Sequence, residues 1–268
     1  MHSCRIALSA ALIALAPPSI PVAGAQGFAA VVSPPRFEIA AKPGERVRQV
    51  IEISNAAPQP ARYYLRTADW QITPDAGVSF ADDLAAGSCR PWVAIERREI
   101  EVPGNGSVRY RFEVQPPAAA PSGECRFALM IEGDEQTVRT ESGVQVPISG
   151  RIAVIVYVAV GDAAPNLRVA GATVAEVNGR PLPVLEVVNS GNAHGRVAGF
   201  LTATDAQGRK LDLSPSTLPI LPGETRRIAL SPDDGAAGPV ELAYPLTVKG
   251  TLELGARQRV EFERQFTR

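Results

Sequence analysis

Apolar and polar residues alternate along most of the chain, and no long segment repeats its apolar residues with the period of a helix. Residues 107–114 show the alternation most clearly, with apolar positions at Val108, Tyr110, Phe112 and Val114. A period of two is typical of an antiparallel strand that buries one face. The same pattern predicts strands at 47–54, 126–132 and 184–188. Turns rich in Pro, Gly and Asn separate these segments, which favours an all-β fold of the sandwich type with little helix.

The chain repeats this plan. Residues 49–69 and 183–205 each contain an apolar strand that ends in Asn, a polar turn, and a second strand that ends in Asp. A Pro-Gly turn follows in each half, at 102–106 and 221–224, and opens another alternating strand. Two matches in the same order predict two related immunoglobulin-like β-sandwich domains in tandem. The expected boundaries are 26–160 for the first domain, 161–166 for the linker and 167–268 for the second domain.

The first 25 residues have the organisation of a secretory signal peptide. Arg5 supplies a positive charge, residues 6–16 are apolar, and 23–25 are small residues of the kind that precedes a cleavage site. The apolar part is about half as long as a segment that spans a bilayer, so we expect no stable membrane insertion. Cys4 comes before the apolar part, too early for a lipid-bearing cysteine. We therefore predict export and a mature chain that begins near Gln26.

Two cysteines, Cys89 and Cys125, remain after this cleavage. In an exported protein such a pair favours a disulfide. The bond would close a loop of about 37 residues and contribute about 3–4 kcal/mol to stability. Two separate buried thiols are the alternative. In either case the cysteines would have a structural role.

The composition provides little for catalysis or cofactor binding. Histidine occurs only at His2, in the predicted signal peptide, and at His194, which we interpret as a residue of a surface loop. A zinc site of three or four ligands would have to use carboxylates, and no Gly-rich phosphate loop occurs. The 27 basic and 28 acidic residues nearly balance, which does not indicate a nucleic-acid partner. We expect no cofactor, no metal and no enzymatic activity; the remaining enzymatic alternative is a pair of carboxylates, for which no segment singles out candidates.

The segment 143–160 combines two patterns. Val144, Val146 and Ile148 lie on alternate positions, and a nearly continuous apolar run follows from 152 to 160. Pro147 removes an N–H from any ladder, which only an edge strand or a bulge tolerates. An edge strand with three large aliphatic side chains is normally an aggregation hazard. The second half is typical of a strand that is buried on both faces.

Five segments in order carry a resemblance to a known family. They are 31–39 with Arg36, 51–70, 121–132 with Glu124, 143–158 and 188–200. Together they resemble the PapD-like periplasmic pilus (fimbrial) chaperone family over almost the whole mature chain, in pattern more than in identity. The resemblance implies two immunoglobulin-like domains set at an angle, localisation in the periplasm and no catalysis. It also implies the binding of pilus-like or spore-coat-like subunits, their delivery to an outer-membrane usher, and a part in cell wall organisation.

The same resemblance implies roles for particular residues. In donor-strand complementation, a chaperone strand completes the unfinished sandwich of a subunit. The family's strand G, here 143–160, would supply the donor side chains Val144, Val146 and Ile148. A basic pair in the cleft of the family holds the subunit's C-terminal carboxylate. Arg36 matches one member of that pair by its position. Its guanidinium suits the role because it offers bidentate hydrogen bonds to a carboxylate.

This sequence departs from the family pattern at two positions. Ala153 stands where the family has the second basic residue, a lysine. Arg151 lies two positions earlier on the same face of the strand, displaced by about 7 Å, and is our candidate for that role. Tyr157 stands where the family often has an arginine that connects the two domains, so Glu124 loses an expected partner.

Each of these roles has a simpler alternative. The three aliphatic residues would otherwise be core residues of an internal strand, and Arg36 would otherwise belong to a solvated face. For the whole protein, the alternative is a secreted structural or adhesive protein built of immunoglobulin-like modules.

Overall fold

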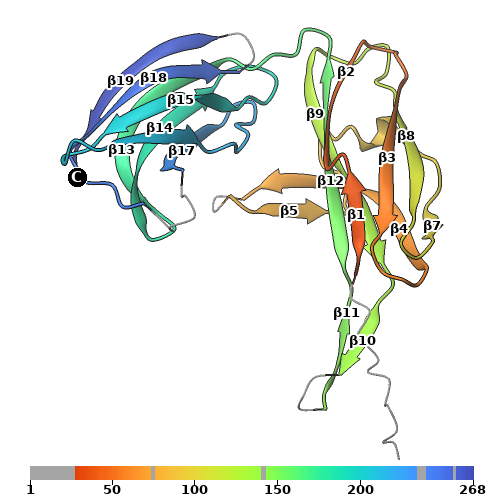
Figure 1. The fold of residues 1–268 in the computed structure, drawn as a ribbon. Coiled ribbons are helices and arrows are strands. Elements are labelled where there is room, and N and C mark those ends of the chain that lie inside the picture. The colour runs from red at the N-terminus through yellow and green to blue at the C-terminus, as the bar shows by residue number, and fades with distance from the viewer. Residues whose placement is uncertain (1–27, 74–75, 140–142, 234–239, 256–257) are drawn as a thin grey trace, which may run out of the picture.

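The computed structural model describes residues 28–73, 76–139, 143–233, 240–255 and 258–268, which form an all-β protein (Figure 1). The predicted signal peptide lies outside these residues. Two lobes follow each other along the chain and meet at an angle near the linker, so the predicted tandem of β-sandwiches is confirmed. A short 3-10 helix, η1 (Arg90–Trp92), is the one helical element in the described part of the chain.

The N-terminal lobe contains two main sheets and a small hairpin. The first sheet has the order β1 (Ala30–Ser33), β3 (Val47–Asn55), β8 (Ser107–Val114) and β6 (Val93–Ile95). The second has the order β2 (Arg36–Ala41), β12 (Arg151–Val160), β9 (Gly123–Gly133), β4 (Ala61–Ile72) and β5 (Val78–Ala81), and β7 (Glu99–Val102) pairs with β4. The hairpin consists of β10 (Gln136–Arg139) and β11 (Gln145–Ile148). Neighbouring strands are antiparallel except β2 and β12, which are parallel.

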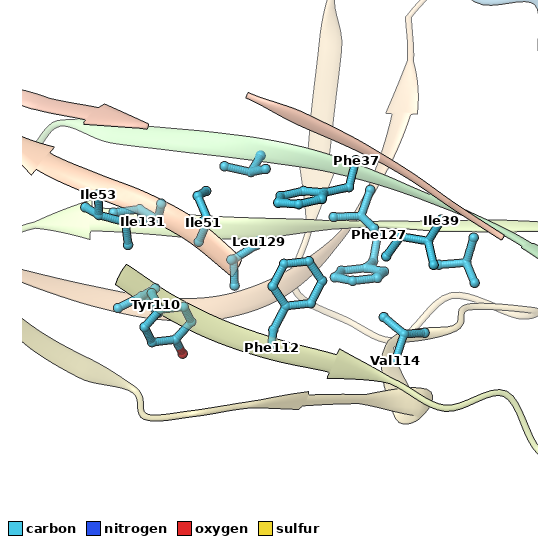
Figure 2. Close-up of a cluster of buried hydrophobic side chains, with 14 of the residues drawn as sticks. Phe37, Ile39, Ile51, Ile53, Tyr110, Phe112, Val114, Phe127, Leu129 and Ile131 are labelled. Atoms are coloured by element: carbon cyan, nitrogen blue, oxygen red, sulfur yellow. The ribbon is translucent and has the colours of Figure 1, made fainter. Parts of the chain in front are cut away.

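Side chains from the facing surfaces of the two main sheets form the core of this lobe (Figure 2). Phe112 of β8 contacts Phe37 of β2 and Phe127 of β9 edge to face, with ring centroids 5.2 Å and 6.2 Å apart. Tyr110, Phe112 and Val114 are at most 1% exposed, which confirms the alternation predicted for 107–114. Since one face of the second sheet is used for this core, its other face is available for a site.

The C-terminal lobe is built from seven antiparallel strands. Their order is β13 (Leu167–Val177), β14 (Arg180–Asn189), β17 (Thr225–Pro232), β16 (Lys210–Pro215), β15 (Val197–Thr204), β18 (Leu246–Leu254) and β19 (Arg259–Phe266). β16 pairs with both β17 and β15, so the strands surround a single core.

The repeat seen in the sequence corresponds to the same local structure in both lobes. Asn55 ends β3 and Asn189 ends β14, and both are at most 1% exposed. In each lobe the side-chain oxygen accepts a hydrogen bond from the N–H two residues later, at 3.0 Å. The side-chain NH₂ donates to the carbonyl four residues later, at 2.7 Å from Asn55 and 2.8 Å from Asn189. The asparagine at the end of each apolar strand therefore fixes the turn that follows.

The predicted disulfide is also confirmed. Cys89, which is completely buried, is bonded to Cys125 of β9, and the two Cα atoms lie 5.8 Å apart. The next residue, Arg90, pairs with Asp69 of β4 at 3.3 Å between Nη1 and Oδ2. The segment that leads into η1 is therefore attached to two neighbouring strands of the second sheet.

Candidate functional site

The predicted strand at 143–160 is interrupted. The structure forms β11 and β12 instead, separated by Ser149 and Gly150, so the expectation of one continuous strand is corrected. The reason lies at Gly150, because a Cβ atom there would be 2.0 Å from Cγ of Phe28. The Phe28 ring occupies the space that a side chain would need at this position, so glycine is required where the chain passes the ring. The pairing with β9 ends here, at the hydrogen bond from Gly133 to Gly150, and β11 lies beyond it.

β11 belongs to a hairpin that projects from the end of the N-terminal lobe farthest from the linker (Figure 1). Within the described part of the chain, β10 is the only strand that pairs with β11, and Pro147 lies opposite Thr137. The exposed fractions of Val144, Val146 and Ile148 are 57%, 39% and 45%. The three candidate donor side chains therefore lie outside both hydrophobic cores.

Ile148 lies nearest to the body of the lobe. It lines a cavity of about 320 Å³ together with Phe28 and Tyr63. The hydroxyl of Tyr63 is buried there and has no hydrogen-bond partner among the described residues, and burial raises the pKa of Tyr63. The base of the hairpin is therefore a concave surface with an aliphatic residue at its edge.

The second half of the segment is embedded in the sheet. In β12, Val154, Val156 and Val158 point into the core and are not exposed. Residues on the opposite side, which we call the outer face of the second sheet, include Tyr157, which is 3% exposed. Leu221 of the C-terminal lobe belongs to the apolar cluster that covers this part of the outer face. The prediction of a strand buried on both faces therefore holds best where the two lobes meet.

The two candidate anchor residues both lie on the outer face, but they are far apart along it. Arg36 of β2 is opposite Ile155, and Arg151 stands four positions before Ile155 on β12. At about 3.3 Å per residue, this places them about 13 Å apart along the strand direction. Arg36 is half-exposed and pairs with Glu38 at 3.1 Å between Nε and Oε1. Arg151 is exposed and lies opposite Glu132 of β9.

A third guanidinium on the outer face was missed in the sequence. Arg126 of β9 lies opposite Tyr157, and its guanidinium carbon is 5.4 Å from the centroid of the Trp70 ring. Its Nε is buried without a hydrogen-bond partner, and no ion pair in the described part of the chain involves Arg126. The buried Nε leaves one donor of this half-buried guanidinium unsatisfied, and an anion bound here could accept from it. The sequence indicated its place on the outer face only indirectly, because Arg126 precedes Phe127, which faces the core.

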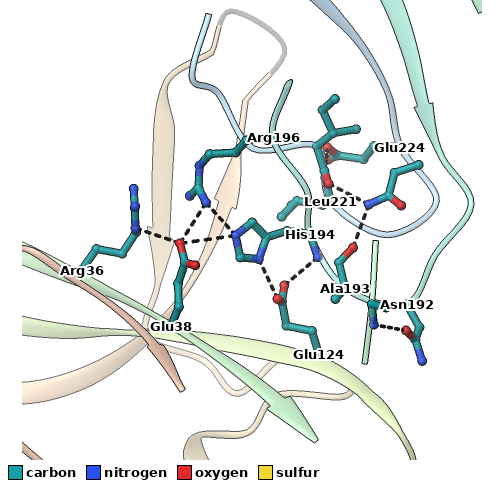
Figure 3. A network of polar contacts seen from close by, with 12 residues as sticks. Arg36, Glu38, Glu124, Asn192, Ala193, His194, Arg196, Leu221 and Glu224 are labelled. Atoms are coloured by element: carbon teal, nitrogen blue, oxygen red, sulfur yellow. Dashed lines mark hydrogen bonds and ion pairs between the residues drawn. The ribbon is translucent and has the colours of Figure 1, made fainter. Parts of the chain in front are cut away.

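A polar network joins the two lobes close to Arg126 and Tyr157 (Figure 3). His194 of the C-terminal lobe lies 2.6 Å from Glu124 of β9, measured from Nδ1 to Oε2, and its backbone N–H donates to the other carboxylate oxygen at 3.2 Å. The exposed fractions of the two side chains are 8% and 4%. The interpretation of His194 as a surface residue is therefore wrong, and His194 is the partner that Glu124 was expected to lack.

The network continues towards Arg36. Nη1 of Arg196 lies 2.8 Å from Nε2 of His194 and 2.9 Å from Oε1 of Glu38. Because Glu38 also accepts from Arg36, one carboxylate of the N-terminal lobe connects the candidate anchor to the C-terminal lobe. Neither Glu38 nor Arg196 was identified from the sequence; the signal for Glu38 was its place one position from Phe37 on an alternating strand.

The ring of Tyr157 packs against the residues that join the two lobes. The imidazole of His194 stacks on its ring, with centroids 3.8 Å apart and an angle of 25° between the planes. The Arg196 guanidinium carbon lies 5.6 Å from the same ring centroid. Burial raises the pKa of Tyr157 to about 12, so the hydroxyl stays protonated at neutral pH. A neutral aromatic platform thus replaces the arginine that the family resemblance led us to expect at this position.

The described residues contain no group of three or more His, Cys, Asp or Glu side chains placed to hold a metal ion. Among them there is also no helix of the length and apolar character needed to cross a membrane.

The fold is similar to solved structures of chaperones, many of them fimbrial. The CupB2 chaperone of Pseudomonas aeruginosa is 13% identical with a TM-score of 0.44, and the match covers 88% of this chain and 100% of that chain. The E. coli chaperone DraB is 13% identical with a TM-score of 0.44, covering 88% and 98%. A complex of the Salmonella enterica SafA pilin with the SafB chaperone gives 12% identity, a TM-score of 0.46, and coverage of 88% and 96%. No protein-family model and no curated protein sequence matches the chain.

Proposed function

We propose that this protein is an exported periplasmic chaperone that holds an incomplete β-sandwich subunit by donor-strand complementation. The observation that carries the proposal is the exposure, outside both cores, of three aliphatic side chains on alternate positions: Val144 just before β11, and Val146 and Ile148 within it. The signal-peptide pattern and the resemblance of five segments to the pilus chaperone family support it. The subunits would be pilus-like or spore-coat-like, and the complex would deliver them to an outer-membrane usher.

The energetics favour a partner for β11. An exposed strand with Val144, Val146 and Ile148 on alternate positions is prone to aggregation when its edge is open. A subunit that lacks one strand offers both backbone hydrogen bonds and an apolar groove. Filling that groove would contribute about 1.5–3 kcal/mol for each donor side chain before ordering costs. The same three residues that are unfavourable in water thus become the main source of affinity.

The outer face would hold the C-terminal carboxylate of the subunit. Arg36 and Arg151 are the proposed anchor residues, and the register places the small Ala153 between their positions. Arg126 is an additional candidate, since it lies on the adjacent strand with its Nε unpartnered and its guanidinium over Trp70. A carboxylate that bound there would provide the missing charge, and bidentate hydrogen bonds would fix its orientation.

Co-expression with candidate subunits tests the donor side chains. We expect Val146→Asp or Ile148→Asp to lower the recovery of a tagged, exported β-rich subunit encoded beside this gene by tenfold or more, because a charge would enter an apolar groove. Gln145→Asp is the matched control, since Gln145 is exposed on the other face of β11 and should leave recovery unchanged. Circular dichroism would verify that all three variants fold. Equal recovery with the Val146 and Ile148 variants would rule out donor pairing.

A second co-expression experiment tests the anchor. Arg36→Ala and Arg126→Ala are expected to weaken subunit binding by about 2 kcal/mol or more if the carboxylate is desolvated in the complex. Arg109→Ala, an exposed position on β8 of the other sheet, should have no effect. A subunit without its C-terminal residues should bind wild-type protein as poorly as the intact subunit binds the variants. If truncated and intact subunits are retained equally, the anchor role is wrong while the donor role still stands.

A further inference from the structure

The contacts of His194 determine where its ring carries a proton. Arginine has only hydrogen-bond donors, so the contact of 2.8 Å between Nη1 of Arg196 and Nε2 of His194 requires Nε2 to accept. Nδ1 then carries the proton and donates it to the Glu124 carboxylate at 2.6 Å. The arrangement therefore specifies a neutral imidazole in the Nδ1–H form. The ring lies between the Glu124 carboxylate of the N-terminal lobe and the Arg196 guanidinium of the C-terminal lobe.

The charged groups around this ring come from both lobes. Glu124 and Glu38 of the N-terminal lobe lie 2.6 Å and 3.7 Å from its two nitrogens, and the neutral Tyr157 lies under its face. Arg196 is the cation in direct contact. The remaining charged groups at the joint are Arg36, which is paired with Glu38, and Arg126, which faces Tyr157 from β9.

A second proton on the ring is incompatible with one of these contacts. Protonated Nε2 is a donor and part of a cation, so it would face another donor and another cation at 2.8 Å. An acceptor close by is Oε1 of Glu38, at 3.7 Å from the same nitrogen, which would become more accessible once Arg196 leaves it. Arg196 is about one-fifth exposed and can turn towards water, whereas Glu124 is buried and keeps its hydrogen bond to Nδ1.

We propose that His194 is a proton-operated latch between the lobes, in which protonation makes Nε2 exchange Arg196 for Glu38. In the neutral state Arg196 connects the ring to Glu38. In the acidic state two carboxylates of the N-terminal lobe hold the imidazolium directly, and Arg196 is released. Because Glu38 also pairs with Arg36, the exchange draws a competing carboxylate away from the candidate anchor; this last consequence rests on the proposed function.

The latch can be tested on the free protein, because His194 is the only histidine after His2. In ¹⁵N-labelled protein without residues 1–25, long-range ¹H–¹⁵N spectra report this ring alone. We expect the Nδ1–H form at pH 7.5 and the doubly protonated form on acidification. The Nε–Hε signal of Arg196, assigned by its loss in Arg196→Gln, should shift over the same pH range as the ring. An Nε2–H form at pH 7.5, or an Arg196 signal that does not change when the ring is protonated, would overturn the proposal.

Variants give a second test. At a pH where wild-type protein shows both forms of the ring, Arg196→Gln should raise the ratio of protonated to neutral His194 roughly threefold or more, because a neutral amide replaces the repelling cation. Glu38→Gln should lower that ratio by a similar factor. Arg168→Gln, an exposed position at the start of β13, is the matched control and should change nothing. Identical ratios in all three variants would overturn the latch, whatever the outcome of the subunit-binding experiments.

Discussion

Replacing Asn189 with alanine is expected to lower the free energy of unfolding of the C-terminal lobe by roughly 2–4 kcal/mol, since each buried polar group left without a partner costs about 1–3 kcal/mol. The NH₂ group of Asn189 donates to the carbonyls of Ala193 and Ile220, both at 2.8 Å. Its oxygen accepts from the N–H groups of Gly191 and Asn166, at 3.0 Å and 3.1 Å. Alanine would leave these four backbone groups without the side chain that pairs with them, at a position that is 0% exposed.

Urea denaturation followed by fluorescence and circular dichroism would measure this effect. Asn55→Ala should produce a loss of the same order in the N-terminal lobe, because Asn55 makes the equivalent contacts with its own turn. Gln207→Ala is the control, since this exposed side chain lies in a turn of the C-terminal lobe. A loss below about 1 kcal/mol for Asn189→Ala would mean that water replaces the side chain, and the turn would not depend on it.

These asparagines also show which part of the fold is readable in the sequence. The alternation at 107–114 and the strand–Asn–turn plan of the two halves are local patterns, set by the two-residue period of a strand and by side-chain contacts within four residues. Local patterns of this kind predicted the all-β tandem, which the structure confirms. The disulfide was predicted for a different reason, namely the chemistry of an exported pair of cysteines.

The break between β11 and β12 was not readable in the same way. It depends on Phe28, which lies more than a hundred positions earlier and occupies the space beside Gly150. The pairing of β11 with β10 also uses the segment before 140, which appears in the sequence only as a short charged connection. Contacts between distant segments decide both features, and a two-residue period carries no information about them.

The joint between the lobes was misread for a related reason. Glu38 and Arg196 are 158 positions apart, and His194 lies in a segment with the composition of a surface loop. The one signal in the sequence was the rarity of histidine, with a single residue after the predicted signal peptide. Rarity by itself did not indicate burial against Glu124. The angle between two lobes creates contacts that neither lobe predicts alone.

Removing the disulfide is expected to have a comparable effect on the N-terminal lobe. A double variant, Cys89→Ala with Cys125→Ala, should lose about 3–4 kcal/mol, because the bond restricts an unfolded loop whose ends are 36 residues apart. Wild-type protein treated with dithiothreitol should lose a similar amount in urea denaturation. The double variant is its own control, since its stability should not respond to dithiothreitol. Equal stability of reduced and oxidised wild type would contradict the expectation.

The same bond should affect the candidate site, because Cys125 lies between Glu124 and Arg126 on β9. Without the bond, the segment that leads into η1 still contacts β4, for example through Arg90 and the N–H of Ala85, which both reach Asp69. Hydrogen exchange of the β9 amides near residue 125 should then accelerate more than exchange in β8, on the opposite sheet. Faster exchange confined to the loop before η1 would instead mean that β9 holds Glu124 and Arg126 in place through its strand pairing alone.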